Sequence, residues 1–306
     1  MNKISIGNGS IIVPEIGLGC MRLTELDEKQ ALKHVNTALE YECNFFDHAD
    51  IYAGGESERL FGKIVDLKGA EREKLIIQTK CAIRPGICYD FSKRYILESV
   101  DGSLKRLQTD YIDILLLHRP DTLMEPEEVA AAFDELKNSG KVRHFGVSNQ
   151  NPGQIALLNK YCDNQIQINQ LQFSLTNCGM IDAGLNVNMS NGESVNRDGG
   201  ILEYCRIHDI SIQAWSPFQY GMFEGTFLNK EKFPELNKKI DEMADKYQVT
   251  NSAIAIAWIL RHPANIQPIV GTTNQQRLKD IFSASDIALT REDWYALYMA
   301  SGKQLP

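Results

Sequence analysis

The sequence has no long apolar segment and no clustered run of Lys and Arg. Its most apolar stretch, SAIAIAWIL at 252–260, has about half the length that a membrane-spanning helix requires. The formal net charge of -8 at pH 7 disfavours a surface that binds nucleic acid. We therefore expect neither a membrane nor a nucleic acid among the partners.

The seven cysteines form no C-x-x-C pair and no cluster with histidine at the spacing of metal ligands. The sequence thus predicts no metal site. Scattered cysteines in odd number fit a reducing, cytoplasmic setting better than a disulfide framework. We expect these thiols to be buried, small apolar residues, with a redox sensor among them as the alternative.

Strand-like and helix-like segments alternate along all 306 residues, and no linker divides the chain. Eight short apolar or β-branched runs predict strands at 16–19, 44–49, 75–80, 112–118, 142–148, 167–173, 211–216 and 266–272. Helical periodicity appears at 27–42, 57–67, 92–107, 127–139, 153–161, 200–208, 235–262 in two pieces, and 274–283. Eight such units, with strands apolar on both faces, predict one α/β domain over 1–306, a closed (β/α)8 TIM barrel.

Four segments lie outside this repeat. Residues 3–13 have apolar arms around Gly-Asn-Gly, which predicts a β-hairpin that caps the bottom of the barrel. A final helix is expected near 290–300. The connections 174–199 and 217–234 show no obvious structure of their own, and loops of this length usually serve a site.

Polar side chains stand where the predicted strands end. In a barrel of this kind the carboxyl ends of all the strands converge on one mouth. The residues expected there are Asp47 with nearby Tyr52, Lys80, His118, Ser148 with Asn149, Gln170, Trp215 and the segment 271–277. Tyr52, His118 and Trp215 would each pass for packing residues if taken alone, and their convergence is what favours a functional role.

Four of these residues together suit proton donation to a carbonyl oxygen. A phenol with a pKa of ~10 is a weak acid at neutral pH, and an adjacent ammonium such as Lys80 lowers that value. Asp47 can keep Lys80 charged through an ion pair, and His118 can hydrogen-bond the substrate oxygen. The pattern predicts Tyr52 as the general acid.

The matching reaction is hydride transfer to a carbonyl, because no activated Ser or Cys nucleophile is visible. Ser148, Asn149 and Gln170 suit the carboxamide of a nicotinamide, and Trp215 offers a flat face for its ring. At the last strand-to-helix turn, residues 271–277 suit an anion such as the 2′-phosphate of NADPH, with Thr272, Thr273, Asn274 and Arg277 as its ligands.

Seven motifs resemble those of the aldo-keto reductases, in order and over essentially the whole chain. They are DHADIYAGGESERLFGK, LIIQTK, YIDILLLHRPD, SGKVRHFGVSN, INQ, AWSPF and GTTNQQR. Bacterial oxidoreductases with a D-H-A-D-I-Y motif look most similar. The resemblance implies a (β/α)8 barrel that uses NADP(H) and a tetrad in which Tyr52 donates the proton, Lys80 lowers its pKa, Asp47 holds Lys80 and His118 positions the carbonyl.

The resemblance also implies which residues contact the cofactor. Ser148, Asn149 and Gln170 would hold the carboxamide, Trp215 the ring, Ser216 and Phe218 the pyrophosphate, and Thr272, Thr273 and Arg277 the adenosine phosphate, with Met21, Arg22, Asp47 and Gly271 as further contacts. Four positions depart from the pattern or are ambiguous. Trp215 stands where a tyrosine is more usual. His48 replaces a more usual threonine, as a packing residue or a second titrating group. Gly271 replaces a frequent basic residue, which leaves Arg277 as the main phosphate ligand. Asp50 is either a ribose contact or a solvated carboxylate.

Two other functions stay open at this point. A lysine at the end of a barrel strand can form a Schiff base, so a lyase that uses Lys80 is one alternative. A redox-sensing regulatory protein that binds nicotinamide and turns over slowly is the other. For the reductase, the expected partner is a small-molecule carbonyl substrate, and the expected assembly is a monomer or weak oligomer.

Overall fold

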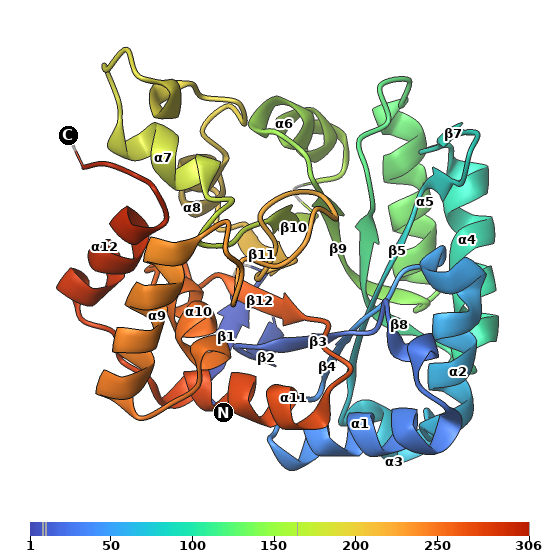
Figure 1. Ribbon diagram of the computed structural model, residues 1–306. Coiled ribbons are helices and arrows are strands. Elements are labelled where there is room, and N and C mark those ends of the chain that lie inside the picture. The colour runs from blue at the N-terminus through green and yellow to red at the C-terminus, as the bar shows by residue number, and fades with distance from the viewer. Residues whose placement is uncertain (8, 10, 164, 306) are drawn as a thin grey trace.

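The computed structural model describes residues 1–7, 9, 11–163 and 165–305. Eight parallel strands close into a barrel in the order β10-β11-β12-β3-β4-β5-β8-β9, and helices surround it (Figure 1). The barrel strands are β3 (Gly17–Gly19), β4 (Phe45–Asp47), β5 (Ile76–Cys81), β8 (Ile112–Leu117), β9 (Val142–Ser148), β10 (Ile166–Gln172), β11 (Ser211–Trp215) and β12 (Gln267–Val270). The predicted (β/α)8 TIM barrel and its eight strands are confirmed.

The helices follow the predicted segments within a few residues. They are α1 (Glu28–Glu40), α2 (Glu56–Ile64), α4 (Lys93–Leu107), α5 (Pro126–Asn138), α6 (Pro152–Tyr161), α8 (Ile201–Ile207), α9 (Pro234–Tyr247), α10 (Asn251–Leu260), α11 (Gln275–Phe282) and α12 (Arg291–Ala300). Their starts have side-chain caps where the sequence provides them. Asp27 forms a capping box with Gln30, and Ser92 accepts a hydrogen bond from the Tyr95 backbone N–H.

Several short elements were not predicted. They are α3 (Gly69–Glu73), α7 (Gly179–Leu185), a small hairpin of β6 (Ile83–Arg84) and β7 (Cys88–Tyr89), and the 3-10 helices η1 (Leu23–Glu25), η2 (Tyr52–Gly55), η3 (Gly192–Ser194) and η4 (Ser283–Asp286). The expectation that 174–199 has no structure of its own was therefore wrong, because α7 and η3 lie within it. Helices this short carry too few turns for a visible hydrophobic period.

The N-terminal hairpin closes one end of the barrel. Its strands β1 (Lys3–Ile6) and β2 (Ile11–Pro14) pair antiparallel, and residues 8 and 10 of the predicted turn lie outside the described residues. Ile6 and Val13 are buried in a cluster with side chains from the barrel strands, namely Phe45, Ile114, Leu116, Ile168 and Ile269. The Gly7 backbone N–H donates to Ser211 Oγ at 3.1 Å, and Ser211 is the first residue of β11, so the hairpin caps the end opposite the mouth.

A glycine in the first barrel strand makes room for this packing. A Cβ atom on Gly17 would lie 2.8 Å from side-chain atoms of both Phe45 and Ile269. The interior is filled at this level, and only glycine leaves space for the two larger residues.

Six of the seven cysteines are buried, whereas Cys88 is exposed on β7. The expectation of burial is thus wrong for Cys88, because the β6–β7 hairpin that carries it was not foreseen. Among the described residues, no helix has the length and apolar character needed to cross a membrane.

Candidate active site

Two adjacent strands and the turn after the first of them place the central charged groups. β4 and β5 pair in parallel with Asp47 opposite Gln78, and alternation along β5 puts Lys80 on the same inner face two residues later. Tyr52 follows at the start of η2, where Ala53 and Gly54 adopt positive φ values of 50° and 65°. Asp47 and Lys80 are 3% and 1% exposed, so their charges are almost fully removed from water.

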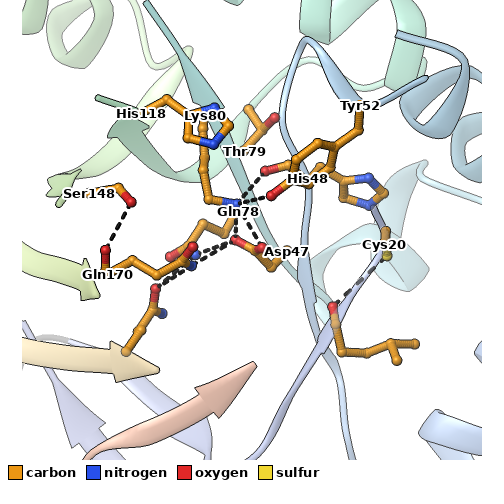
Figure 2. Close-up of polar contacts among 12 residues, drawn as sticks. Cys20, Asp47, His48, Tyr52, Gln78, Thr79, Lys80, His118, Ser148 and Gln170 are labelled. Carbon is orange, nitrogen blue, oxygen red and sulfur yellow. Dashed lines mark hydrogen bonds and ion pairs between the residues drawn. The ribbon is translucent and has the colours of Figure 1, made fainter. Parts of the chain in front are cut away.

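Lys80 is bound on all sides by acceptors. Its Nζ atom lies 2.7 Å from each carboxylate oxygen of Asp47, 2.9 Å from the His48 carbonyl oxygen and 3.1 Å from the Tyr52 hydroxyl (Figure 2). Burial acts to lower the pKa of Lys80, but the Asp47 carboxylate and Tyr52 outweigh it, so the pKa is raised. Lys80 is therefore a charged ammonium at neutral pH.

The ammonium fixes the direction of the Tyr52 hydroxyl hydrogen. An ammonium has no lone pair, so in the contact between Lys80 and Tyr52 the phenol oxygen must accept. The phenol proton is then free to point elsewhere. Burial raises the pKa of Tyr52 above its usual value, and the Lys80 ammonium opposes part of that rise. The lowering by Lys80 is present as expected, but burial outweighs it, and Tyr52 is a neutral phenol at neutral pH.

His118 stands beside the phenol at the end of β8. Its ring lies 5.9 Å from the Tyr52 ring, edge to face, and its Nδ1 atom is buried without a hydrogen-bond partner among the described residues. Burial, together with the nearby charges of Lys80 and Arg119, lowers the pKa of His118 well below its usual value. The imidazole is therefore neutral and has one ring N–H to offer.

The two ambiguous residues of the D-H-A-D-I-Y motif now have distinct environments. His48 is fully buried, packs edge-on against Phe61 at 4.6 Å, and has a pKa lowered to about 3 by burial and by Lys80. It is a packing residue and does not titrate near neutral pH. Asp50 is partly buried beside Glu58, and burial with that second carboxylate raises its pKa to about 7. It is not an ordinary solvated carboxylate.

The residues expected at the nicotinamide form one connected group next to Asp47. The Ser148 hydroxyl donates to the Gln170 carbonyl oxygen at 2.8 Å, and Asn149 Nδ2 donates to that hydroxyl at 2.7 Å. Trp215 Nε1 donates to Asn149 Oδ1 at 3.0 Å. The Gln170 side chain donates to Asp47 at 3.1 Å. Strands β9, β10 and β11 therefore bring these side chains to the same mouth as the charged pair.

The residues expected at the adenosine end gather where the first and last barrel strands end. Arg22 Nε donates to the Gly271 carbonyl oxygen at 3.0 Å, and both residues line a small cavity with Thr272 and Thr273. Arg277 lies in the first turn of α11, which Asn274 caps. Its guanidinium makes no ion pair with any described residue.

The last three residues expected to contact the cofactor lie in the turns and loops that follow β3 and β11. Met21 is 40% exposed in the turn after β3. Ser216 has a φ of 49° directly after β11, and Phe218 is partly buried against the core in the following loop.

The two long loops are joined at the rim of the mouth. Ser174 Oγ donates to the Gln219 carbonyl oxygen at 2.7 Å, and Gln172 Nε2 donates to the Gly221 carbonyl oxygen at 3.0 Å. Arg119, next to His118, reaches toward the same rim with its guanidinium 5.7 Å from the centre of the Trp215 ring.

Sequence reasoning missed three buried glutamines that lie behind the site. Gln78 and Gln170 both donate to Asp47, Gln213 accepts from both of them, and Gln267 accepts from Gln213. A signal was available, because Gln78 lies two residues before Lys80 and Gln213 two residues before Trp215. Residues two apart in a strand face the same side, so Gln78 and Gln213 both had to point into the barrel.

The comparisons with known proteins agree with this geometry. The family model described as "Aldo/keto reductase family" matches residues 15–300. A 6-dehydroglucose reductase of Novosphingobium aromaticivorans is 34% identical over 310 residues, with 98% of this chain and 96% of that protein covered. The uncharacterized oxidoreductase YcsN of Bacillus subtilis is 35% identical, with 94% of each chain covered.

A solved structure has a similar fold. The crystal structure of the thermostable aldo-keto reductase Tm1743 with the inhibitor epalrestat superposes with a TM-score of 0.80 at 24% identity, over 98% of this chain and 100% of that one. The barrel and its relatives thus define an NAD(P)H-dependent oxidoreductase that acts on carbonyl groups. The chain belongs to the aldo/keto reductase family.

Proposed function

We propose that the protein reduces an aldehyde or ketone to an alcohol with NADPH, and that Tyr52 is the general acid. The observation that carries this proposal is the 3.1 Å contact in which Lys80 donates to the Tyr52 hydroxyl oxygen. Because the phenol oxygen accepts there, its own proton is available to a substrate oxygen at the mouth.

The other members of the tetrad have supporting roles in this proposal. Lys80 stabilises the phenolate that remains after proton donation, since it is charged and in contact with the oxygen. Asp47 keeps Lys80 charged and fixed through two short contacts. His118 is neutral, so its ring N–H can hydrogen-bond the substrate carbonyl oxygen and orient it beside Tyr52.

The residues at the mouth fit a nicotinamide dinucleotide. A nicotinamide cofactor held there would supply the hydride for the carbonyl carbon. Ser148, Asn149 and Gln170 offer hydroxyl and amide groups to the carboxamide, and the Trp215 ring offers a stacking face. Trp215 is held in place by its hydrogen bond to Asn149, so this face is preorganised.

We assign the preference for NADPH to Arg277, with Thr272 and Thr273 beside it. Arg277 has no carboxylate partner among the described residues, and it stands in the first turn of α11, where the helix N-terminus favours a phosphate. Arg22 spans from the first strand end to Gly271 and would close the other side of the adenosine site.

The substrate class is a small carbonyl compound that carries polar groups. The name of the relative from N. aromaticivorans indicates a sugar-derived carbonyl, 6-dehydroglucose, as the first candidate. Arg119 supports such a choice, because a half-buried guanidinium beside His118 can donate hydrogen bonds to hydroxyl or carboxylate oxygens of a substrate.

The state of Lys80 argues against a Schiff-base lyase. A lysine that attacks a carbonyl must be neutral, whereas the pKa of Lys80 is raised and its ammonium donates to Asp47, His48 and Tyr52. The redox-sensing alternative shares the cofactor site and differs in turnover, so the test must measure binding and turnover separately.

The experiment is a panel of aldehydes, ketones and 6-dehydroglucose, assayed by loss of NADPH absorbance with NADH run beside it. Dissociation constants of both dinucleotides are measured by calorimetry on the same protein. Turnover with NADPH that exceeds turnover with NADH is the expected result. Tight binding without oxidation by any carbonyl would favour a redox sensor, and absence of dinucleotide binding would refute the proposal. Sedimentation of the same sample tests the predicted monomer or weak oligomer.

A further inference from the structure

Four buried glutamine side chains cross the barrel interior between the mouth and the N-terminal hairpin. They are Gln170 and Gln78 at the level of Asp47, then Gln213, then Gln267, and each is 2% exposed or less. We call these four residues the glutamine chain. Gln267 Nε2 donates to the Pro14 carbonyl oxygen at 2.8 Å, so the glutamine chain ends at the N-terminal hairpin. Figure 2 shows Gln78 and Gln170 meeting at Asp47.

Both ends of the glutamine chain can only accept hydrogen bonds. At one end stands the Pro14 carbonyl, and at the other the Asp47 carboxylate, whose two oxygens accept from the Lys80 ammonium. A glutamine side chain has a donor NH₂ and an acceptor oxygen, and its orientation follows from its neighbours. Two fixed acceptors at the ends therefore determine the orientation of every amide between them.

The orientations follow step by step from the hairpin. Because Pro14 accepts, Gln267 must turn its NH₂ group toward it, and its Oε1 accepts from Gln213 Nε2 at 2.9 Å. Gln213 Oε1 then faces the mouth and accepts from Gln78 Nε2 at 2.8 Å and from Gln170 Nε2 at 3.0 Å. Those two NH₂ groups also donate to Asp47, at 2.6 Å and 3.1 Å.

Gln170 thus has both amide hydrogens committed to the interior. One points to Asp47 and the other to Gln213, while its Oε1 accepts from no described residue. We infer that Gln213 and Gln267 are positioning residues that make Gln170 present an acceptor, and not a donor, to the nicotinamide site. The inference rests on the proposed function, in which Gln170 contacts the carboxamide, and it assigns that contact to the carboxamide NH₂ group.

The glutamine chain also explains why Gln170 would lose this orientation if Gln213 were replaced. Without the Gln213 oxygen, one N–H of Gln170 has no acceptor inside the barrel, and the remaining contact to Asp47 is the longer of its two at 3.1 Å. A buried N–H without an acceptor is costly, so the amide would rotate to bring that hydrogen toward the mouth. Gln170 would then offer a donor as well as an acceptor.

The test uses an oxidised NADP analogue in which an acetyl group replaces the carboxamide, so that the carbonyl stays and the NH₂ donor is lost. Dissociation constants for NADP⁺ and for this analogue are measured by calorimetry, which needs no turnover. Wild-type protein is expected to bind NADP⁺ about tenfold or more tightly than the analogue, because a buried acceptor loses its donor. In Gln213→Met, which keeps the side-chain length, the ratio is expected to fall to about threefold or less.

Gln78→Met is the matched control. Gln78 is as buried as Gln213 and, like Gln170, donates to Asp47 and Gln213, but it makes no hydrogen bond to Gln170. This variant is expected to keep the wild-type ratio even if both dissociation constants rise. If Gln213→Met and Gln78→Met had equal ratios of the two dissociation constants, the glutamine chain would have only a structural role, and the inference would be overturned. Gln267→Met takes the place of Gln213→Met if the latter does not fold, and a reduced ratio is expected there too.

The failure of this inference can be told apart from failure of the proposed function. Wild-type protein that binds NADP⁺ and the analogue equally would refute the acceptor role of Gln170 and leave the reductase intact. Wild-type protein that binds neither compound would refute both.

Discussion

Lys80 donates a hydrogen bond to the Tyr52 hydroxyl oxygen at 3.1 Å while it holds both oxygens of Asp47 at 2.7 Å. One ammonium thus connects a buried carboxylate to the phenol that is proposed to protonate the substrate. Two consequences can be measured separately, one in turnover and one in stability.

Replacement of Tyr52 by phenylalanine tests the proton donor. The ring and its edge contact with His118 stay, so we expect unchanged NADPH affinity and a kcat for carbonyl reduction that is about 10²–10⁴-fold lower. Stopped-flow measurement of NADPH oxidation checks the rate, and calorimetry checks binding. Tyr95, a partly buried tyrosine that donates to the Ile83 carbonyl, serves as the control in Tyr95→Phe. Turnover of Tyr52→Phe near the wild-type rate would exclude Tyr52 as the acid.

Loss of one partner of the buried ion pair tests its contribution to stability. Lys80→Met leaves the buried Asp47 carboxylate without its cationic partner, and we expect the free energy of unfolding to fall by about 3–5 kcal/mol. The double variant Asp47→Asn/Lys80→Met should recover much of that loss, since no buried charge remains. Urea denaturation of the two single variants and the double variant measures the coupling. Additive losses would show that the two side chains do not interact as described.

Arg277→Ala tests the phosphate site. Only NADPH carries the extra phosphate, so we expect its dissociation constant to rise about 10- to 100-fold, while that of NADH changes little. Lys279, two residues further along α11, gives the control variant Lys279→Ala. Equal weakening of both dinucleotides by Arg277→Ala would move the phosphate site to other residues.

Asp50 gives a pH-dependent prediction. Its pKa is raised from 3.8 to about 7 in the folded protein, so between these values the unfolded chain ionises and the folded protein does not. The stability contribution of Asp50 is therefore present below pH ~4 and is lost as pH rises to ~7. Asp50→Asn should stabilise the protein by roughly 2–4 kcal/mol above neutral pH and have no such effect near pH ~4.

Urea denaturation across this pH range measures the effect, with the exposed Asp66→Asn as control. A gain that does not depend on pH would mean that Asp50 does not titrate between pH ~4 and ~7.

The sequence predicted the barrel well because apolar strands and helices alternate eight times, and each repeat supports the same architecture. It also predicted that Asp47, Tyr52, Lys80 and His118 would meet, since strand ends in a parallel barrel converge. The proposed roles of these residues stay predictions until they are tested. The environment of Asp50 could not be foreseen, because its neighbour Glu58 comes from the following helix and only folding brings the two carboxylates together.

The glutamine chain shows a different limit of sequence reasoning. The spacing from Lys80 places Gln78 of LIIQTK on the inner face of its strand, but it does not identify the partners of the amide. Its partners Gln213 and Asp47 lie 135 and 31 positions away. Hydrogen bonds over such separations follow from barrel closure and not from any local pattern.

The hydrogen bonds that join the loops around Ser174 and Gln219 bear on how substrate range can change in evolution or by design. A substitution that moves one loop also strains its partner, because Gln172 and Gly221 are tied at a second point. Variants with altered selectivity should therefore arise from compensating pairs of changes, one on each side of the opening, more often than from single replacements.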